Sequence, residues 1–295
     1  MAATIIDGKR VAEQIKAELA QRIDFLKQKN IIPGLAAVLV GEDPASHVYV
    51  NSKAKMCDRL GMYSRVVQLD KNISAAKLLA VVAQLNGDEK IHGILIQSPL
   101  PEHINAPRIY ESILPQKDVD GFHPVNRGRL QLGEKAFVPC TPAGVQELLV
   151  RSGFSLAGKH VVILGRSAIV GMPLALLLMQ KHAHANATVT VCHSATKNLA
   201  QITSTAEVLI AAIGRANFVT AEMIREGAIV VDVGVNRITD ASASKGYYLA
   251  GDVDFKAAQQ RAAAITPVPG GVGPMTIIML MQNTVVAAES IGLGA

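Results

Sequence analysis

Aromatic residues, basic runs and charged residues in general are scarce in this sequence. Aromatics make up 4% and charged residues 18% of its 295 residues, and the formal net charge is +5. A mild positive balance without a basic run or interleaved aromatics does not indicate nucleic-acid binding. It does favour an anionic substrate or cofactor.

Cysteine is also rare, and its three positions are scattered. Cys57, Cys140 and Cys192 have no metal-ligand spacing, so we expect no metal site and a reducing compartment. The first ten residues lack the apolar region of a signal peptide, and no apolar stretch reaches the length of a membrane span. The sequence therefore predicts a cytoplasmic protein that contacts no membrane.

What the sequence has in quantity is hydrophobic residues, at 49%, arranged in alternating strand and helix patterns. Strands alternating with helices indicate parallel α/β packing. A stretch rich in proline, glycine and charge, residues 115–142, is a candidate domain junction. Helices are expected at about 9–29, 46–60 (capped by Ser46), 74–85 (capped by Ser74), 142–152, 174–180 and 275–290, and strands at 35–40, 65–69, 93–97, 161–164, 188–192, 208–213, 229–233 and 265–268.

A strand, a glycine turn and a helix start are expected between residues 158 and 173. Gly165 and Gly171 bound the turn, and Pro173 fits the first helical turn, where its missing N–H costs nothing. The free N–H groups and the dipole of such a helix start favour an anion, here a dinucleotide pyrophosphate. The Gly-x-x-x-x-x-Gly spacing differs from the usual Gly-x-Gly-x-x-Gly, so an ordinary strand-to-helix turn is the alternative.

The residues after the next strand, 188–192, indicate which dinucleotide is bound. NAD sites place an Asp or Glu there for the ribose hydroxyls, but this chain continues with Cys-His-Ser. Arg166 lies within the glycine turn, and Ser194, Thr196 and Lys197 lie near the expected ribose. A cation and hydroxyls suit a ribose phosphate, so we expect NADP rather than NAD, the alternative being that Arg166 is a solvated loop residue.

Tyr49 and Lys53 lie four residues apart on one predicted helix, so their side chains share a face. To act as a base at neutral pH, a lysine must lower its pKa by roughly 3, at a cost of about 4 kcal/mol. Partial burial beside a phenol and an amide can supply this. A surface lysine with its amine in water is the alternative.

Three further features each have a functional and a structural interpretation. Gln97, at the carboxyl end of a strand, is either a ligand contact or a loop cap. Asp118 and Asp120 either include a carboxylate that accepts two N–H bonds from an amino-pyrimidine-like ring or form an Asx turn. The run Pro269-Gly-Gly-Val-Gly-Pro274 either brings bare backbone close to a ligand or forms a rigid interdomain turn.

Taken in order, these motifs closely resemble the bifunctional methylenetetrahydrofolate dehydrogenase/methenyltetrahydrofolate cyclohydrolase family over nearly the whole chain. Ser98 stands where many relatives carry a leucine, and Ala168 where an asparagine is common; neither change removes a catalytic group. The motifs are Tyr49-x-x-x-Lys53, Gln97-Ser-Pro-Leu-Pro101, Lys117-Asp-Val-Asp-Gly-Phe-His-Pro124, Gly165-Arg-Ser-x-x-Val-Gly-x-Pro173 and Thr266-Pro-Val-Pro-Gly-Gly-Val-Gly-Pro-Met-Thr276.

The resemblance implies oxidation of methylenetetrahydrofolate with NADP, followed by hydrolysis of the methenyl product to formyltetrahydrofolate in the same cleft. Lys53 would manage protons and water, Tyr49 would stack on the substrate, Gln97 would hold Lys53, and Asp120 would grip the pterin. The other implied contacts are Pro269, Gly270 and Gly271 with the folate, and Gly165, Arg166, Ser167, Ser194 and Val235 with NADP.

The resemblance also implies two parallel-sheet α/β domains with a cleft between them, and a homodimer. The folate-binding catalytic domain would comprise residues 1–143 and a returning helix, 276–295. A Rossmann-like NADP-binding domain would comprise residues 144–275.

Two other functions fit parts of the pattern. One is a different NADP-linked dehydrogenase of the same plan, of the shikimate or amino-acid type. The other is a nucleotide-binding regulator without catalysis, against which the trio Tyr49, Lys53 and Gln97 argues.

Overall fold

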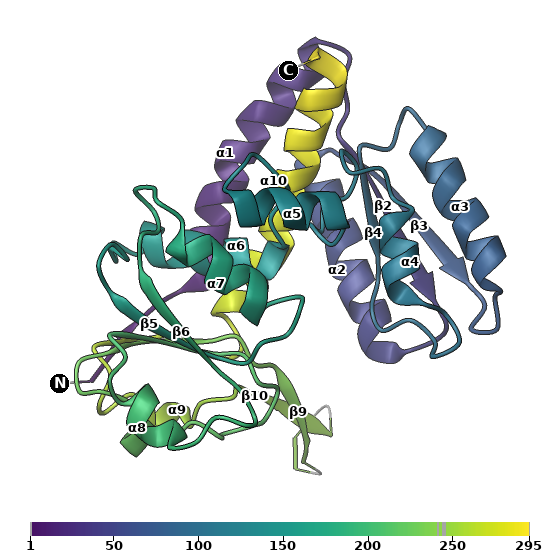
Figure 1. The fold of residues 1–295 in the computed structure, drawn as a ribbon. Coiled ribbons are helices and arrows are strands. Elements are labelled where there is room, and N and C mark those ends of the chain that lie inside the picture. The colour runs from purple at the N-terminus through teal and green to yellow at the C-terminus, as the bar shows by residue number, and fades with distance from the viewer. Residues whose placement is uncertain (1, 241, 244–245, 295) are drawn as a thin grey trace. The chain divides into compact units, whose positions relative to one another are not determined.

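A computed structural model describes residues 2–240, 242–243 and 246–294 of the chain (Figure 1). The chain divides into two compact units. Unit 1 comprises Met1–Glu13 and Thr141–Thr276, and unit 2 comprises Gln14–Cys140 and Ile277–Ala295. Both contain a parallel sheet with helices, which confirms the predicted α/β fold.

Unit 2 is built on a three-stranded parallel sheet of order β3-β2-β4. The strands β2 and β4 are wholly buried because their residues are continuously apolar, whereas the edge strand β3 is partly exposed. The core on one face joins β2 and β4 to helices α3 and α4. The strands are β2 (Gly34–Val40), β3 (Tyr63–Leu69) and β4 (Gly93–Ile96), and the helices are α1 (Gly8–Gln28), α2 (Pro44–Leu60), α3 (Ala75–Gly87), α4 (Ala106–Glu111), α5 (Pro124–Leu132) and α10 (Val272–Leu293).

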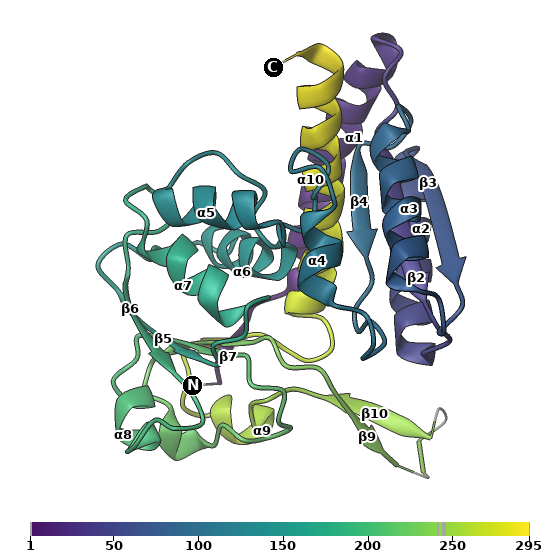
Figure 2. The same cartoon turned by 45° about the vertical axis from the view of Figure 1, so that its right-hand side comes forward.

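Helices α1 and α10 lie side by side in unit 2, as Figures 1 and 2 show. The guanidinium of Arg22 on α1 donates two hydrogen bonds, of 2.9 and 2.6 Å, to the carboxylate of Glu289 on α10. By length and composition α10 could cross a bilayer, so the expectation that no apolar stretch reaches that length is wrong. Half of it is buried in the protein, and Asn283 donates a 2.8 Å bond to the carbonyl of Val119, as in a packed core helix.

Unit 1 contains a six-stranded parallel sheet of order β1-β11-β8-β7-β5-β6. The chain passes from β5 to β6 on one side and then to β7 on the other, so a topological switch point lies at β5, where α/β sheets bind ligands. A hairpin, β9 and β10, extends away from this sheet (Figure 2). The strands are β1 (Thr4–Ile5), β5 (His160–Leu164), β6 (Thr188–Cys192), β7 (Val208–Ala211), β8 (Ile229–Asp232), β9 (Asn236–Thr239), β10 (Tyr247–Ala250) and β11 (Ala264–Ile265), and the helices are α6 (Cys140–Arg151), α7 (Gly171–Met179), α8 (Leu199–Thr203), η1 (Ala221–Met223) and α9 (Phe255–Ala258).

The division into units differs from the predicted one at the N-terminus. Residues 1–13, which we had expected in the folate-binding domain, belong to unit 1 because β1 pairs in parallel with β11, with Thr4 opposite Ala264. A strand of two residues is too short to leave a periodic signal in the sequence. At the other boundaries the observed and predicted divisions differ by one to three residues.

Local corrections concern a cap and a junction. Asp43, not Ser46, caps α2: its carboxylate accepts a 2.8 Å hydrogen bond from the Ser46 amide, and Pro44 occupies the first turn. The expected cap of α3 by Ser74 is confirmed. The junction at 115–142 contains helix α5, which begins after His123.

Candidate active site

Lys53, on α2, is paired with the residue that follows β4. Its Nζ donates a 2.9 Å hydrogen bond to Oε1 of Gln97, and Nε2 of the Gln97 side chain donates a 2.7 Å hydrogen bond to the backbone carbonyl of Ser98. Because β4 ends at Ile96, Gln97 is the first residue beyond the carboxyl end of the strand. The structure thus brings together two residues 44 positions apart that the sequence predicted to share a site.

Burial lowers the pKa of Lys53, and the negative charge of Asp120 partly opposes this. Burial likewise raises the pKa of Asp120, while Lys53, a hydrogen bond from Cys140 and the charge of Arg127 act in the other direction. Desolvation disfavours the charged form of each group, and the attraction between their opposite charges partly offsets this effect. The amine is therefore less basic than that of an exposed lysine, as a proton acceptor near neutral pH must be.

The two aspartates of the Asp118-Val-Asp120 motif differ in their surroundings. Asp118 is buried, and its carboxylate accepts hydrogen bonds from the amides of Phe122 (3.1 Å) and His123 (2.8 Å) and from Nδ2 of Asn126 (2.8 Å). Burial raises its pKa to about 6 in spite of these bonds. Asp118 therefore shapes the turn, which leaves Asp120 as the carboxylate beside Lys53.

Tyr49 lies one helical turn before Lys53 on α2, and its side chain is 46% exposed. The spacing places both side chains on one side of the helix, as predicted. An exposed aromatic ring one helical turn from a partly buried amine provides a surface on which a flat ligand can stack.

Four residues of this region were missed by the sequence analysis. The Tyr110 hydroxyl lies 2.7 Å from Oγ of Ser98, and its ring packs edge-on against Phe122. The guanidinium of Arg127 lies 5.4 Å from the centre of the Phe122 ring. Cys140 forms a hydrogen bond with the carboxylate of Asp120, and Nδ2 of Asn283 donates a hydrogen bond to the carbonyl of Val119, next to Asp120. The sequence carried no local signal for these four residues.

In unit 1, most of the predicted dinucleotide contacts line one pocket of about 320 Å³. It lies at the carboxyl ends of β5, β6 and β7, around the switch point. Val235 is not among its described lining residues and is 46% exposed. The pocket is lined by Leu164, Gly165, Arg166, Ser167, Cys192, His193, Ser194, Leu199, Ala212, Ile213, Arg215 and Phe218.

The two glycines of the turn are required by close backbone packing. Gly165 has a φ of +109°, and a side chain there would overlap the carbonyl of Ala212. A side chain at Gly171 would overlap the carbonyl of Gly165. Oγ of Ser167 accepts hydrogen bonds from the amides of Val170 (3.2 Å) and Gly171 (3.4 Å). The amide of Met172 donates a 3.1 Å bond to the carbonyl of Ser167. The first two amides of α7, which we had expected to be open to an anion, are therefore already bonded, and Ser167 has a structural role as well.

The pocket wall after β7 is held by a buried carboxylate that the sequence analysis missed. Asp252 is 0% exposed and accepts hydrogen bonds from the amides of Ile213 (2.7 Å), Gly214 (2.9 Å) and Arg215 (2.9 Å). It also accepts a 2.9 Å bond from Nδ2 of Asn236. Arg215 adds a second cation to the pocket, beside Arg166. An aspartate 37 positions away in sequence gave no local signal of this role.

The segment Pro269–Gly271 lies in unit 1. Gly270 has a φ of +116°, and a side chain at Gly271 would lie 2.7 Å from the carbonyl oxygen of Pro267. The first residue of α1, Gly8, packs against the backbone of Gly271 so closely that a side chain there would overlap it. Close backbone packing therefore explains why glycines occupy these positions, and the folate contacts expected of them stay a prediction.

These features define a two-unit α/β protein with a dinucleotide-type pocket at a sheet switch point in one unit and a partly buried lysine–amide pair in the other. Models of two family domains match the chain. The tetrahydrofolate dehydrogenase/cyclohydrolase catalytic domain covers residues 6–120, and the NAD(P)-binding domain of the same family covers residues 139–291. The chain belongs to the tetrahydrofolate dehydrogenase/cyclohydrolase family, which confirms the resemblance seen in its sequence.

Individual relatives match over almost the full length. "Bifunctional protein FolD" of Dehalococcoides mccartyi (strain CBDB1) is 56% identical over 295 residues, covering 99% of each chain. A crystal structure of the bifunctional FolD enzyme from Campylobacter jejuni is 49% identical with a TM-score of 0.93, covering 98% of this chain and 100% of that one. The Trypanosoma brucei enzyme, solved with NADP and an inhibitor, is 40% identical with a TM-score of 0.93 and covers all of both chains.

Proposed function

We propose that this protein oxidises methylenetetrahydrofolate to methenyltetrahydrofolate with NADP and hydrolyses the product to formyltetrahydrofolate. The observation that carries the hydrolytic half is the hydrogen bond between Lys53 and Gln97, together with the burial that lowers the pKa of the amine. The dehydrogenase half is supported by the pocket at the switch point of unit 1 and by the family's NAD(P)-binding domain. This is the chemistry of one-carbon metabolism.

In the hydrolysis, the neutral amine of Lys53 takes a proton from the water that attacks the methenyl carbon. Oε1 of Gln97 accepts an N–H of this amine and so fixes the direction of its lone pair. A methenyl substrate is cationic, and a nearby positive charge favours the neutral amine further. Asp120 would bind the amino-pyrimidine part of the pterin, and Tyr49 would stack on the substrate.

The residues of the unit 1 pocket fit a phosphorylated dinucleotide. Gly165 allows close backbone approach, Arg166 and Arg215 supply positive charge, and Ser194 supplies a hydroxyl. When bound, NADP supplies the hydride acceptor, and the chain has to bind and orient it. Ser167 and Val235 are the remaining proposed contacts, and Pro269, Gly270 and Gly271 are proposed for the folate.

One coupled assay tests both halves of the proposal. Methylenetetrahydrofolate and NADP are supplied, and methenyl absorbance is followed as it appears and decays. We expect NADP reduction to depend on the folate, with no reduction when hydroxy acids or amino acids replace it. Reduction with a hydroxy acid alone would favour another dehydrogenase class and contradict the proposal.

We also infer that the protein works as a homodimer in the cytoplasm. The family resemblance supports the dimer, and three free cysteines support a reducing compartment. Sedimentation of the full chain at micromolar concentration tests the oligomeric state, and a monomer would contradict this inference.

Arg166→Ala is expected to weaken NADP binding far more than NAD binding. Removing the guanidinium removes a charge-assisted contact to the ribose phosphate, worth about 1.5–3 kcal/mol, and NAD lacks that phosphate. Titration of each dinucleotide measures the two affinities, with Arg225→Ala, outside the pocket, as the control. Equal losses for both dinucleotides would mean that Arg166 does not contact the phosphate.

Asp120→Asn is expected to shift the acid limb of methenyl hydrolysis to lower pH. The charge of Asp120 raises the pKa of Lys53, so its removal lowers that pKa and leaves more neutral amine at acid pH. The measurement is kcat at saturating substrate against pH, corrected for the uncatalysed reaction. Asp58→Asn, which removes an exposed carboxylate on the same helix as Lys53, is the control. A limb that stays in place or moves to higher pH would contradict the assignment of Lys53.

A further inference from the structure

A pocket of about 720 Å³ lies in unit 2, around the amino ends of strands β2, β3 and β4. Its volume is within the range of small-molecule sites. Lys53 and Gln97 belong to the carboxyl ends of the same sheet, so this pocket is a separate site. It is lined by Asn30, Ile31, Ile32, Tyr63, Asn86, Gly87, Glu89, Lys90, Ile91, His92, Lys117, Ile291 and Gly292.

Apolar side chains from separate segments form most of its wall. Ile32 follows α1, Ile91 precedes β4, and Ile291 is on the last turns of α10, while Tyr63 opens β3. Ile32 and Ile291 are 52% and 42% exposed, although both are large apolar residues. Such a wall buries the apolar body of a ligand.

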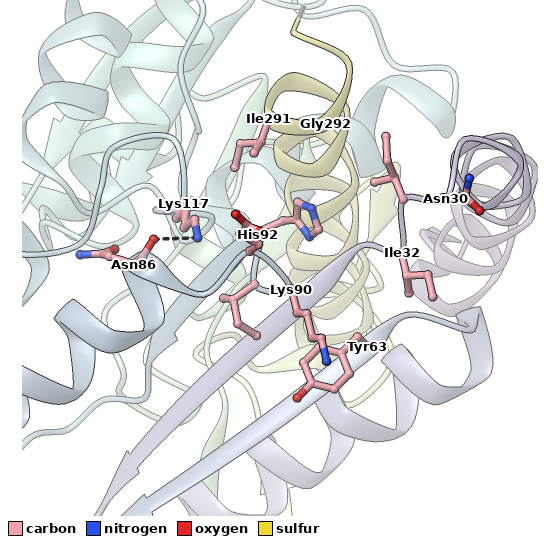
Figure 3. Close-up of a pocket in the computed structure, with 13 residues that line it drawn as sticks. Asn30, Ile32, Tyr63, Asn86, Lys90, His92, Lys117, Ile291 and Gly292 are labelled. Carbon is pink, nitrogen blue, oxygen red and sulfur yellow. Dashed lines mark hydrogen bonds between the residues drawn. The ribbon is translucent and has the colours of Figure 1, made fainter.

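His92 places a hydrogen-bond donor in this wall. Its side chain is only 7% exposed, and its Nδ1 accepts a 3.1 Å hydrogen bond from the backbone amide of Gly34. The ring proton is therefore on Nε2. No described residue forms a hydrogen bond with Nε2. Figure 3 shows the imidazole projecting between the end of α10, at Ile291 and Gly292, and the segment carrying Asn30 and Ile32.

Two lysines give this end of the unit positive charge. Lys117 is buried, and its Nζ donates to the carbonyls of Asn86 and Asp88 at 2.9 Å each, at the end of α3. Lys90 is exposed, and no described residue pairs with its ammonium. Among the described lining residues, the single carboxylate is that of Glu89, which is exposed.

We propose that this pocket binds a small apolar carboxylate, with its hydrocarbon body against the isoleucines and its carboxylate at His92 Nε2, while Lys90 adds positive charge to the same pocket. A donor and a cation beside an apolar wall recognise an acid better than the neutral molecule of the same shape. The buried ammonium of Lys117 adds to this preference. The folate and dinucleotide assignments above use none of these residues.

The position of the pocket links it to the candidate active site through short segments of chain. The four residues of β4 separate His92 from Gln97, and Lys117 precedes Asp120 by three residues. A ligand that fixes His92 and the surroundings of Lys117 contacts both segments that carry the groups around Lys53. The site is thus placed to influence hydrolysis.

The test is a titration of the full chain with cyclohexanecarboxylate, followed by calorimetry and by the ring NMR signals of His92. We expect saturable binding with a Kd of about 1 mM, typical of a ligand of this size, and a shift of the His92 signals along the same curve. Cyclohexanecarboxamide, of the same shape but uncharged, is expected to bind at least about tenfold more weakly.

Ile291→Glu and Ile291→Lys form a matched pair of variants at an exposed position. Both remove the same apolar side chain, but only the glutamate repels a carboxylate, so we expect at least about tenfold weaker binding in Ile291→Glu and retained binding in Ile291→Lys. Equal affinity for acid and amide, full affinity in Ile291→Glu, or no saturation by about 20 mM would each overturn the proposal. Binding is measured independently of catalysis, so failure here leaves the proposed function intact.

Discussion

Lys53→Met is expected to reduce methenyl hydrolysis at least about 100-fold, the lower end of what a positioned general base contributes. Methionine keeps the length and most of the apolar contacts of the side chain but has no basic nitrogen. Gln97 then loses its partner, while the pocket of unit 1 is untouched. NADP affinity should therefore stay within a few-fold of the wild-type value. The measurements are the decay of methenyl absorbance and a dinucleotide titration on the same preparation.

Lys55→Met is the matched control for this experiment. Lys55 is exposed and lies two residues further along α2. Its substitution therefore makes the same chemical change without affecting the hydrogen bond to Gln97. It should leave both hydrolysis and NADP affinity unchanged. Full hydrolysis in Lys53→Met, or an equal loss in Lys55→Met, would reject Lys53 as the proton acceptor.

Asp252→Ala is expected to lower the free energy of unfolding of unit 1 by about 3 kcal/mol or more and to abolish measurable NADP binding. The change leaves three backbone amides and the side-chain amide of Asn236 without their acceptor, in a place that is partly buried. Because those amides belong to Ile213, Gly214 and Arg215, the wall of the pocket loses its support. Urea unfolding and amide hydrogen exchange at these three residues measure the effect.

Asp254→Ala, two residues away, separates this effect from the loss of an ordinary cap. Asp254 caps α9 by accepting a 3.2 Å hydrogen bond from the amide of Ala257, and such caps contribute about 1 kcal/mol. It should therefore cost about 1 kcal/mol and leave NADP affinity in place. If Asp252→Ala costs no more than Asp254→Ala, or if it retains full NADP affinity, the support assigned to Asp252 is wrong.

The long elements could be predicted because their signals are local. Residues 188–192 form strand β6 as expected, and Ser74 caps α3, since apolar runs and cap residues act within a few positions. The pairing of Lys53 with Gln97 was anticipated from the family resemblance, through the order of the motifs that contain the two residues. Short elements such as β1 and α9 were missed, because two to four residues carry no measurable period.

By itself, the sequence determined the α/β class, the family, the glycine turn and the lysine site, because each depends on residues close together or on motifs in a fixed order. Only the tertiary structure assigned the first strand to unit 1, showed that Asp118 accepts hydrogen bonds within its own turn, and revealed the buried acceptor Asp252 and the pocket at His92. These depend on burial and on contacts between distant segments. Burial sets the pKa of an amine and the cost of an unpaired amide, and no local pattern of residues encodes it.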